Sequence, residues 1–273
     1  MCQDCRSNAI DMTTVGSTAI PAPKPRAVMR GYPPVTTVLV GINAAVFVMM
    51  LLSGVPLDTP NTEQLLKWGA DFGPLSLGTQ PWRILTSTYL HIGILHIGLN
   101  MWCLWSLGNL AERIFDRWTY VITYTCCGIA ASLASLWWHP MVVGAGASGA
   151  IFGLAGALIT ALYLGRLPIP KQALRGTMRS LIAFAGYNLV FGAVGGGIDN
   201  SAHIGGLVMG LVMGAVLARH LTASPDIRNR WNRGLFVATA VVLFAIFNVL
   251  KHSAANPGPL PVATFTWPVP THN

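Results

Sequence analysis

Long apolar stretches separated by short polar connections fill most of the chain from residue 35 onward. A helix that spans a bilayer needs about 20 mostly apolar residues, and seven stretches come close to that length. They are Val35–Leu52, His91–Leu110, Trp118–Trp138, Ala147–Leu164, Leu181–Val194, Ala202–Leu221 and Leu235–Leu250. Lipid admits only helices and closed barrels, because every backbone N–H and C=O must be paired, and these stretches are too long and too uniformly apolar for barrel strands. The pattern therefore predicts an all-α polytopic membrane helix bundle with seven spans.

The composition supports a lipid bilayer as the surroundings of this chain. Of the 273 residues, 53% are hydrophobic and 10% are charged, against about 25% charged in a typical soluble domain. The mean hydropathy is +0.55. The net charge of +8 comes from only 17 basic and 9 acidic residues, which are too few charges for a nucleic-acid interface. These values argue against an ordinary soluble enzyme and predict no nucleic-acid partner.

The basic residues lie mostly on one side of the predicted bundle. Of the 17 Lys and Arg residues, all but Lys67, Arg83 and Lys251 fall before the first stretch or in every second connection after it. Such positions are cytoplasmic by the positive-inside rule. We therefore expect a cytoplasmic N-terminus and an external C-terminus, as an odd number of spans requires. Residues 1–34 contain no apolar run, so we expect no signal peptide.

Four segments are expected along the chain. They are a cytoplasmic segment (1–34), six spans (35–221), a linker with the seventh span (222–254) and a Pro-rich, extended external tail (255–273). The first segment contains one CxxC pair, Cys2 and Cys5. A structural zinc site needs four ligands and no second pair follows, so we expect no bound metal.

Polar side chains stand within three of the apolar stretches, where such groups are costly and usually functional. The second stretch holds His91, His96 and Asn100, the fourth begins near Ser148, and the sixth begins near His203. His96 and Asn100 are four residues apart and therefore share one helix face. In the expected topology His91, Ser148 and His203 all lie toward the outer ends of their helices. We expect these groups to meet in a cavity that opens outward.

The types of these residues fit nucleophilic catalysis. A serine hydroxyl is a weak nucleophile that needs an adjacent base, and a neutral histidine is the usual one, so Ser148 and His203 form a candidate pair. Their two helices are suited to close approach, because glycine recurs at every fourth position in each. These glycines are Gly149 and Gly153 in one helix and Gly206, Gly210 and Gly214 in the other. His96, Asn100 and the Ser148 backbone N–H are candidate donors to a developing oxyanion.

Four motifs in this sequence resemble those of the rhomboid intramembrane serine proteases. Gly146–Gly153 resembles the GxSGxxxG nucleophile motif, and His91…His96…Asn100 resembles the HxxxxHxxxN segment. Ala202–Gly206 with Gly210 resembles the AHxxGxxxG motif, and Trp82-Arg83 resembles the Trp-Arg pair of the first external loop. The resemblance extends from about Val35 to Leu221, with the motifs in the family's order and spacing. The seventh span resembles the C-terminal addition of one subgroup.

The resemblance implies a six-helix rhomboid core, with Ser148 as nucleophile and His203 as general base. It places His96, Asn100 and the Ser148 backbone in the oxyanion hole. The implied substrates are transmembrane segments of other proteins, cleaved near the membrane surface without a metal or cofactor, and the implied location is a bacterial inner membrane. Structural or substrate-adjacent roles are implied for His91, Gly146, Phe152, Trp82, Arg83, Gly206 and Gly210. Phe152 stands where the family often has a Tyr that stacks on the catalytic His, so a ring is kept and the hydroxyl is lost.

Other functions are weighed against proteolysis. A rhomboid-like factor that binds and retains membrane proteins without cleaving them would not need both Ser148 and His203. A transporter would show inverted repeats and helices broken at the midplane, and no repeat is visible. A zinc membrane protease is excluded because no HExxH motif occurs. The sequence leaves the identity of the substrate and the oligomeric state open.

Overall fold

The computed structural model describes residues 33–195 and 198–255 of the chain. The predictions made for Cys2, Cys5 and the Pro-rich tail from residue 256 onward lie outside the described residues. Everything below concerns the helical unit that follows residue 32.

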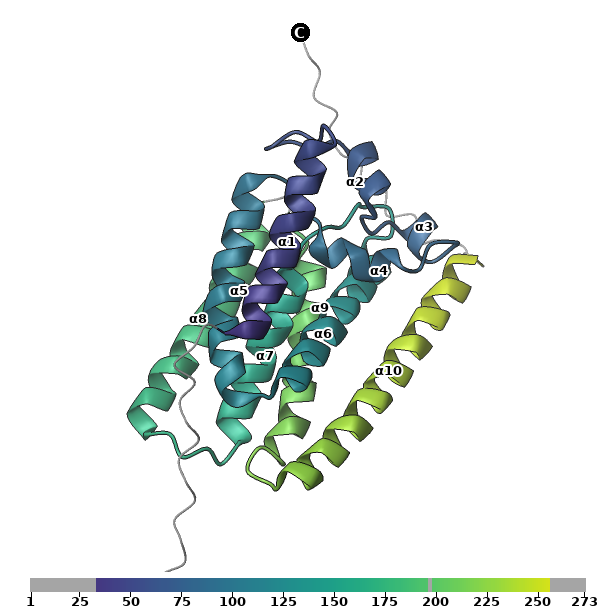
Figure 1. Cartoon of the computed structure of the whole chain (residues 1–273). Coiled ribbons are helices and arrows are strands. Elements are labelled where there is room, and N and C mark those ends of the chain that lie inside the picture. The colour runs from purple at the N-terminus through teal and green to yellow at the C-terminus, as the bar shows by residue number, and fades with distance from the viewer. Residues whose placement is uncertain (1–32, 196–197, 256–273) are drawn as a thin grey trace, which may run out of the picture. The chain divides into compact units, whose positions relative to one another are not determined.

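Seven long helices and several short ones make up the described residues (Figure 1). The long helices are α1 (Pro34–Leu52), α5 (Ile94–Ile114), α6 (Arg117–Trp138), α7 (Ser148–Leu164), α8 (Lys171–Gly195), α9 (Asn200–Ala218) and α10 (Pro225–Ala255). Between α1 and α5 lie the short α2 (Thr62–Trp68), α3 (Gly73–Ser76), α4 (Arg83–Thr86) and the 3₁₀ turn η2 (Ser87–Tyr89). The only β-type pairing within this part of the chain is an isolated bridge between Asp71 and Gly144. The prediction of an all-α membrane helix bundle is confirmed.

Not every long helix has the length of a membrane span. Five of them, α1, α6, α8, α9 and α10, are long and apolar enough to cross a bilayer. The helix α5 qualifies only together with the preceding α4 and η2, from which it is bent by 91°, and α7 is a shorter apolar helix of 17 residues. The structure thus has five or six candidate spans by this measure, where the hydropathy pattern predicted seven.

The predicted helix boundaries were wrong in three instructive places. The second span was expected to begin at His91, but α5 begins at Ile94 because Gly93 adopts a φ of 86° and interrupts the helix. The fifth span was expected at 181–194, and α8 begins ten residues earlier, at Lys171. The seventh was expected at 235–250, and α10 covers 31 residues. Hydropathy marks only the apolar part of a helix, whereas both of these helices continue through charged turns.

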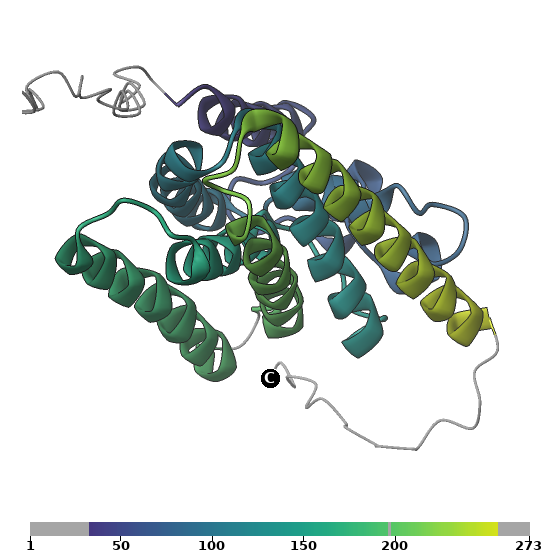
Figure 2. The same cartoon turned by 90° about the horizontal axis from the view of Figure 1, so that it is seen from below.

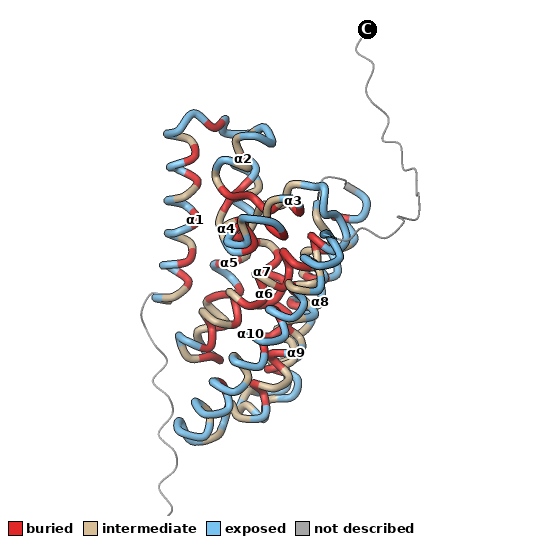
Figure 3. The backbone as a smooth tube through the Cα atoms, turned by 90° about the vertical axis from the view of Figure 1, so that its right-hand side faces the viewer, coloured by how far each residue is buried: buried red, intermediate tan, exposed pale blue. Residues whose placement is uncertain are grey.

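The short helix α7 lies at the centre of the bundle. It packs against α5, α6, α8 and α9, and most of its residues are buried (Figure 3). A helix that is apolar on all sides is stable when either lipid or neighbouring helices surround it, and the packing of α7 shows that neighbouring helices do. Small side chains on α7 let those neighbours come close, which is the arrangement that positions its first residue, Ser148.

The contact between α7 and α9 depends on glycine. A Cβ atom on Gly206 would collide with the carbonyl oxygen of Gly149, and a Cβ on Gly210 would collide with that of Gly153. The hydroxyl of Thr160 donates a hydrogen bond across the same contact to the carbonyl oxygen of Leu211, at 3.0 Å. The close approach predicted from the glycine spacing is therefore confirmed, and it is a backbone-to-backbone contact of the kind that stabilises helices in lipid.

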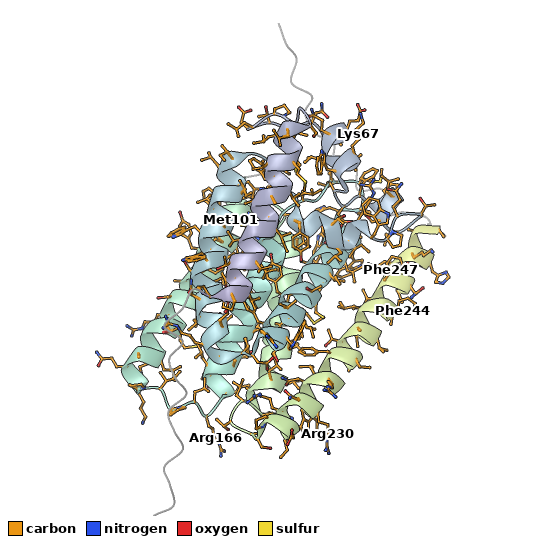
Figure 4. The ribbon with its side chains drawn as sticks, viewed as in Figure 1. Lys67, Met101, Arg166, Arg230, Phe244 and Phe247 are labelled. Carbon is orange, nitrogen blue, oxygen red and sulfur yellow. The ribbon has the colours of Figure 1, made fainter. Side chains whose placement is uncertain are left out.

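The outer helices present apolar side chains outward. In Figure 2 α8 and α10 lie at opposite edges of the bundle. Phe244 on α10 is 68% exposed, whereas Phe247, less than one turn further on, packs against a buried cluster (Figure 4). Exposed apolar surface on this scale is expected where lipid replaces water as the solvent. Charged side chains lie at both ends of the bundle, Arg166 and Arg230 at one end and Lys67 at the other (Figure 4).

The base of α10 is attached to the start of α6. The Asn232 amide donates to the Thr119 hydroxyl at 2.9 Å, and Asp116, which caps α6 through the Thr119 N–H, lies 4.0 Å from the Arg228 guanidinium. Above this base α10 keeps a largely exposed outer face. It is therefore a peripheral helix, which packs on α6 and α9.

Candidate active site

Ser148 is the first residue of α7 and follows a tight, glycine-containing turn. Gly146 has a φ of 143°, which side chains other than that of glycine rarely allow. Its N–H donates to the carbonyl oxygen of Ser87 at 2.9 Å, which ties the turn to η2. Because a helix start leaves its first N–H groups without intrahelical acceptors, the N–H groups of Ser148 and Gly149 are free to bind an anionic oxygen.

His96 lies across this turn from Ser148. The Nδ1 atom of His96 accepts a hydrogen bond from the Ile92 N–H at 3.2 Å, so the neutral ring carries its proton on Nε2. A Cβ built on Gly146 would lie 3.0 Å from His96 Nε2 and 3.7 Å from Ser148 Oγ. A donor N–H and the serine oxygen therefore flank the same small volume, which only glycine at position 146 leaves open.

Asn100 and His91 support His96. The Asn100 amide, which is buried, donates to the carbonyl oxygen of His96 one turn back at 2.9 Å. An Asn amide nitrogen has two N–H groups, so one of them is not used by this bond. The ring of His91 is fully buried and packs edge-on against that of His96, with centroids 5.2 Å apart.

His203 lies in the first turn of α9, which Asp199 caps by accepting a hydrogen bond from the Ala202 N–H at 3.0 Å. Its imidazole is buried and stacks on the ring of Phe152, with centroids 4.1 Å apart and planes 10° apart. The stacking expected of Phe152 is thus confirmed. Phe152 is four residues after Ser148 and shares its face of α7, so the imidazole lies on the face of α7 that carries Ser148.

No hydrogen bond joins Ser148 to His203 within the part of the chain that the structure describes. The Nδ1 atom of His203 is buried without a partner, which leaves Nε2 as the nitrogen available to the serine. Catalytic hydrogen bonds are often long before substrate binds, so this geometry is compatible with a pair that closes on substrate.

The remaining predicted residues lie in the external loop and in the contact between α7 and α9. The Arg83 guanidinium is buried and donates to the carbonyl oxygens of Leu66 at 2.7 Å and Ala70 at 3.0 Å, which holds α2 and the segment after it in place. It also lies 4.8 Å from the centre of the Trp82 ring, which is half exposed. Gly206 and Gly210 lie in the contact between α7 and α9, against the backbone of Gly149 and Gly153.

Two carboxylates beside Ser148 were missed by the sequence analysis. Asp71 and Asp199 both line a recess that also includes Ser148. Asp71 belongs to the segment before α3 and is held by two backbone hydrogen bonds to Gly144, each 2.9 Å long. A single acidic residue between apolar neighbours, Ala70 and Phe72, was the one available signal.

Comparison with known proteins identifies the family of this chain. The family model described as "Rhomboid domain" matches residues 78–220, which contain every predicted site residue. The chain belongs to the rhomboid family. It is an integral, multi-pass membrane protein of that family.

Several named rhomboids are similar to it. The chain is 37% identical over 188 residues to Rhomboid protease GluP of Bacillus subtilis (strain 168), which covers 69% of this chain and 36% of GluP. It is 30% identical over 198 residues to Rhomboid protease AarA of Providencia stuartii, covering 64% of this chain and 69% of AarA. RHOMBOID-like protein 7 of Arabidopsis thaliana is 32% identical over 60% of this chain and 52% of its own length. The matched region thus spans about a third of GluP and about half of the plant protein.

Proposed function

We propose that this rhomboid is an intramembrane serine endopeptidase that cleaves transmembrane segments of other membrane proteins. The observation that carries the proposal is the arrangement around α7. Ser148 stands at a helix start beside the Nε2 atom of His96, and His203 is stacked on Phe152 on the same helix face. The names of the two bacterial relatives, both rhomboid proteases, support it.

In the proposed reaction His203 is the general base. Its Nε2 atom takes the proton of the Ser148 hydroxyl while Oγ bonds to the carbonyl carbon of the scissile peptide. The negative charge that forms on the carbonyl oxygen is stabilised by His96 Nε2–H, the Ser148 N–H and the second N–H of Asn100. The tetrahedral intermediate collapses, the C–N bond breaks, and the imidazolium gives its proton to the leaving amine. An acyl-enzyme on Ser148 remains.

Water completes the proposed cycle. His203, neutral again, takes a proton from a water molecule whose oxygen attacks the acyl carbon. The second tetrahedral intermediate releases the acid product, and the proton returns to Ser148 Oγ. The residues of this cycle supply the nucleophile, the base and the oxyanion donors, so the proposed mechanism uses no metal or cofactor.

The proposal includes an orientation in the membrane. Arg166 and Arg230 lie at one end of the bundle and Lys67 at the other (Figure 4). Most Lys and Arg residues of the described chain lie in or beside the α5–α6, α7–α8 and α9–α10 connections, which belong to the same end as Arg166 and Arg230. By the positive-inside rule that end is cytoplasmic. The N-terminus is then cytoplasmic, the C-terminus external, and a bacterial inner membrane is the proposed location.

The test uses purified protein in detergent with a model transmembrane substrate. Ser148→Ala is expected to lower kcat by at least about 10³-fold, because the nucleophile is removed. His203→Ala is expected to reduce both turnover and labelling of Ser148 by a fluorophosphonate, because the base activates that oxygen. Ser106→Ala and His252→Ala change the same residue types at exposed positions outside the site and are expected to behave like the wild type.

Three outcomes would contradict the proposal. Undiminished cleavage by Ser148→Ala would reject the nucleophile, and equal fluorophosphonate labelling with and without His203 would reject the base. A wild-type protein that binds the substrate and never cleaves it would favour the retention factor instead.

A further inference from the structure

The first half of α8 carries a ladder of basic side chains. Lys171, Arg175 and Arg179 are spaced four residues apart, so they follow one another turn by turn on the same side of the helix. All three are exposed. These three residues, called the basic ladder below, follow Arg166 in the chain, which lies at the same end of the bundle as Arg230 (Figure 4).

No carboxylate compensates the basic ladder within the described part of the chain. None of its three residues forms an ion pair there, and α8 contains no Asp or Glu, nor do α7 and α9, on which it packs. Three acidic residues occur at this end of the bundle. Glu112 accepts hydrogen bonds from Thr36, Asp116 caps α6 beside Arg228, and Asp226 is on α10, at the opposite edge of the bundle (Figure 2).

The depth of the basic ladder follows from the length of α8. Leu174, Met178 and Leu181 attach this part of the helix to the buried cluster that contains much of α7. The uncharged remainder of α8, residues 180–194, extends over about 22 Å at 1.5 Å per residue, whereas the hydrocarbon core of a bilayer is about 30 Å thick. Arg179 therefore lies near or below the level of the lipid headgroups, where a charged side chain is costly without a partner.

An exposed apolar strip continues the basic ladder along the same side of α8. Ile182, Gly186 and Val190 follow Arg179 at helical spacing, and all three are exposed. A Cβ atom on Gly186 would meet no atom within 4 Å, so the strip is open there. The order of cations and then apolar surface matches that of an anionic phospholipid, with its phosphate and then its acyl chains. A soluble anion would use only the first part.

We propose that the basic ladder of α8 binds the phosphate group of an anionic phospholipid, whose acyl chains lie along the strip of Ile182, Gly186 and Val190. Basic clusters next to a membrane-spanning helix attract anionic lipids in this way. The lipid belongs to the leaflet around this end of the bundle, which is the cytoplasmic leaflet in the proposed orientation. The binding is independent of the chemistry at Ser148.

The test compares phosphatidylglycerol with phosphatidylcholine of the same acyl chains. The purified full chain in neutral detergent receives equal amounts of the two lipids, and the retained lipid is identified by native mass spectrometry. The wild type is expected to retain phosphatidylglycerol in preference, and this lipid is expected to raise its melting temperature more than phosphatidylcholine does. Both effects should become smaller at about 1 M salt, where the Debye length is about 3 Å.

The decisive variant is the double substitution of Arg175→Gln and Arg179→Gln. One basic residue near the headgroups contributes about fivefold to affinity, so the preference should fall by about 25-fold or vanish. Replacement of both residues by Lys keeps the charge and should keep most of the preference. Arg230→Gln with Arg233→Gln is the matched control, because it removes two exposed charges at the same end of the bundle. These belong to α10, where Asp226 lies one turn before Arg230, and the wild-type preference should remain.

Several results would overturn this inference. Equal retention of the two lipids by the wild type is one, and an undiminished preference in the Arg175→Gln, Arg179→Gln protein is another. An equal loss in the α10 control would assign the attraction to the whole charged surface and not to the basic ladder. Displacement of the lipid by inorganic phosphate at equal concentration would assign the ladder to a soluble anion. Because no step measures cleavage, Ser148→Ala should bind lipid like the wild type, and failure of the proposed function would leave this result unaffected.

Discussion

The phenyl ring of Phe152 lies parallel to the imidazole of His203, with ring centroids 4.1 Å apart and planes 10° apart. The two residues come from different helices, α7 and α9, and each is less than a tenth exposed. The stack therefore fixes the plane of the histidine ring at a point where the ring has no hydrogen bond of its own among the described residues.

Replacement of Phe152 by Leu should affect catalysis more than folding. Leu keeps most of the apolar volume, and such exchanges usually cost less than about 1.5 kcal/mol of stability. An aromatic stack is worth about 0.5–1.5 kcal/mol, so its loss should lower kcat by up to about tenfold while KM stays unchanged. Steady-state kinetics on a model substrate would measure the split between kcat and KM.

Phe115→Leu is the matched control for this prediction. Phe115 is buried in the same apolar cluster as much of α7, but at the end of α5 that is away from Ser148. It should lose similar stability and keep the wild-type kcat. Equal kcat values for both variants would show that the stack has no part in positioning His203.

Replacement of Gly206 by Ala should separate α7 from α9. The added methyl group would collide with the carbonyl oxygen of Gly149, which is backbone and cannot rotate away. Overpacking of this kind costs about 1–3 kcal/mol, and it moves His203, which lies one turn earlier in α9. Thermal unfolding in detergent and kcat are the measurements, and both should fall.

Gly98→Ala is the matched control for Gly206→Ala, and we expect it not to lower the stability of the protein. A Cβ at Gly98, in α5, would meet no atom within 4 Å, and Ala is the better helix former by up to about 1 kcal/mol. This variant should be at least as stable as the wild type. If Gly206→Ala melted at the same temperature as Gly98→Ala, the close contact would not be needed.

Asp71 should make the protein less stable as the pH rises, whereas most carboxyl groups stabilise the folded state as they ionise. Burial raises the pKa of Asp71 from 3.8 to about 7, so the folded state holds this proton over a range where the unfolded chain has lost it. Its contribution to stability is complete below about pH 4 and is lost as the pH rises through about 7. At 1.36 kcal/mol per unit of pKa shift, the total change is on the order of a few kcal/mol.

The measurement is the difference in unfolding free energy between the wild type and Asp71→Asn across this pH range. Histidine titration contributes equally to both proteins, so the difference isolates Asp71. The wild type should lose stability relative to the variant as the pH rises from about 5 to 8. A difference that stays constant, or that grows in favour of the wild type, would show that Asp71 is not held in its neutral form.

Much of the fold could be predicted from the order of apolar and polar residues. The seven long helices all occur where apolar stretches occur, because lipid forces the backbone to pair with itself in helices. The failures were at helix ends. Hydropathy placed the start of the second span at His91, but α5 begins only after Gly93, at Ile94. Hydropathy also left out the charged turns at the start of α8 and α10, which are helical in the structure.

The sequence by itself determined that this protein is a helical membrane protein and which motif residues are candidates for its chemistry, since both follow from local order along the chain. The glycines of α7 and α9 are identified by their spacing alone, Ser148 by its residue type at the start of an apolar stretch, and Phe152 only by the resemblance to the family. Only the tertiary structure decided that Asp71, 77 positions before Ser148, lies with Asp199 in the recess beside it. The physical reason is that the pKa of a carboxyl group shifts through burial and through the charges that folding brings near it. Neither of these can be inferred from the residues next to it in the sequence.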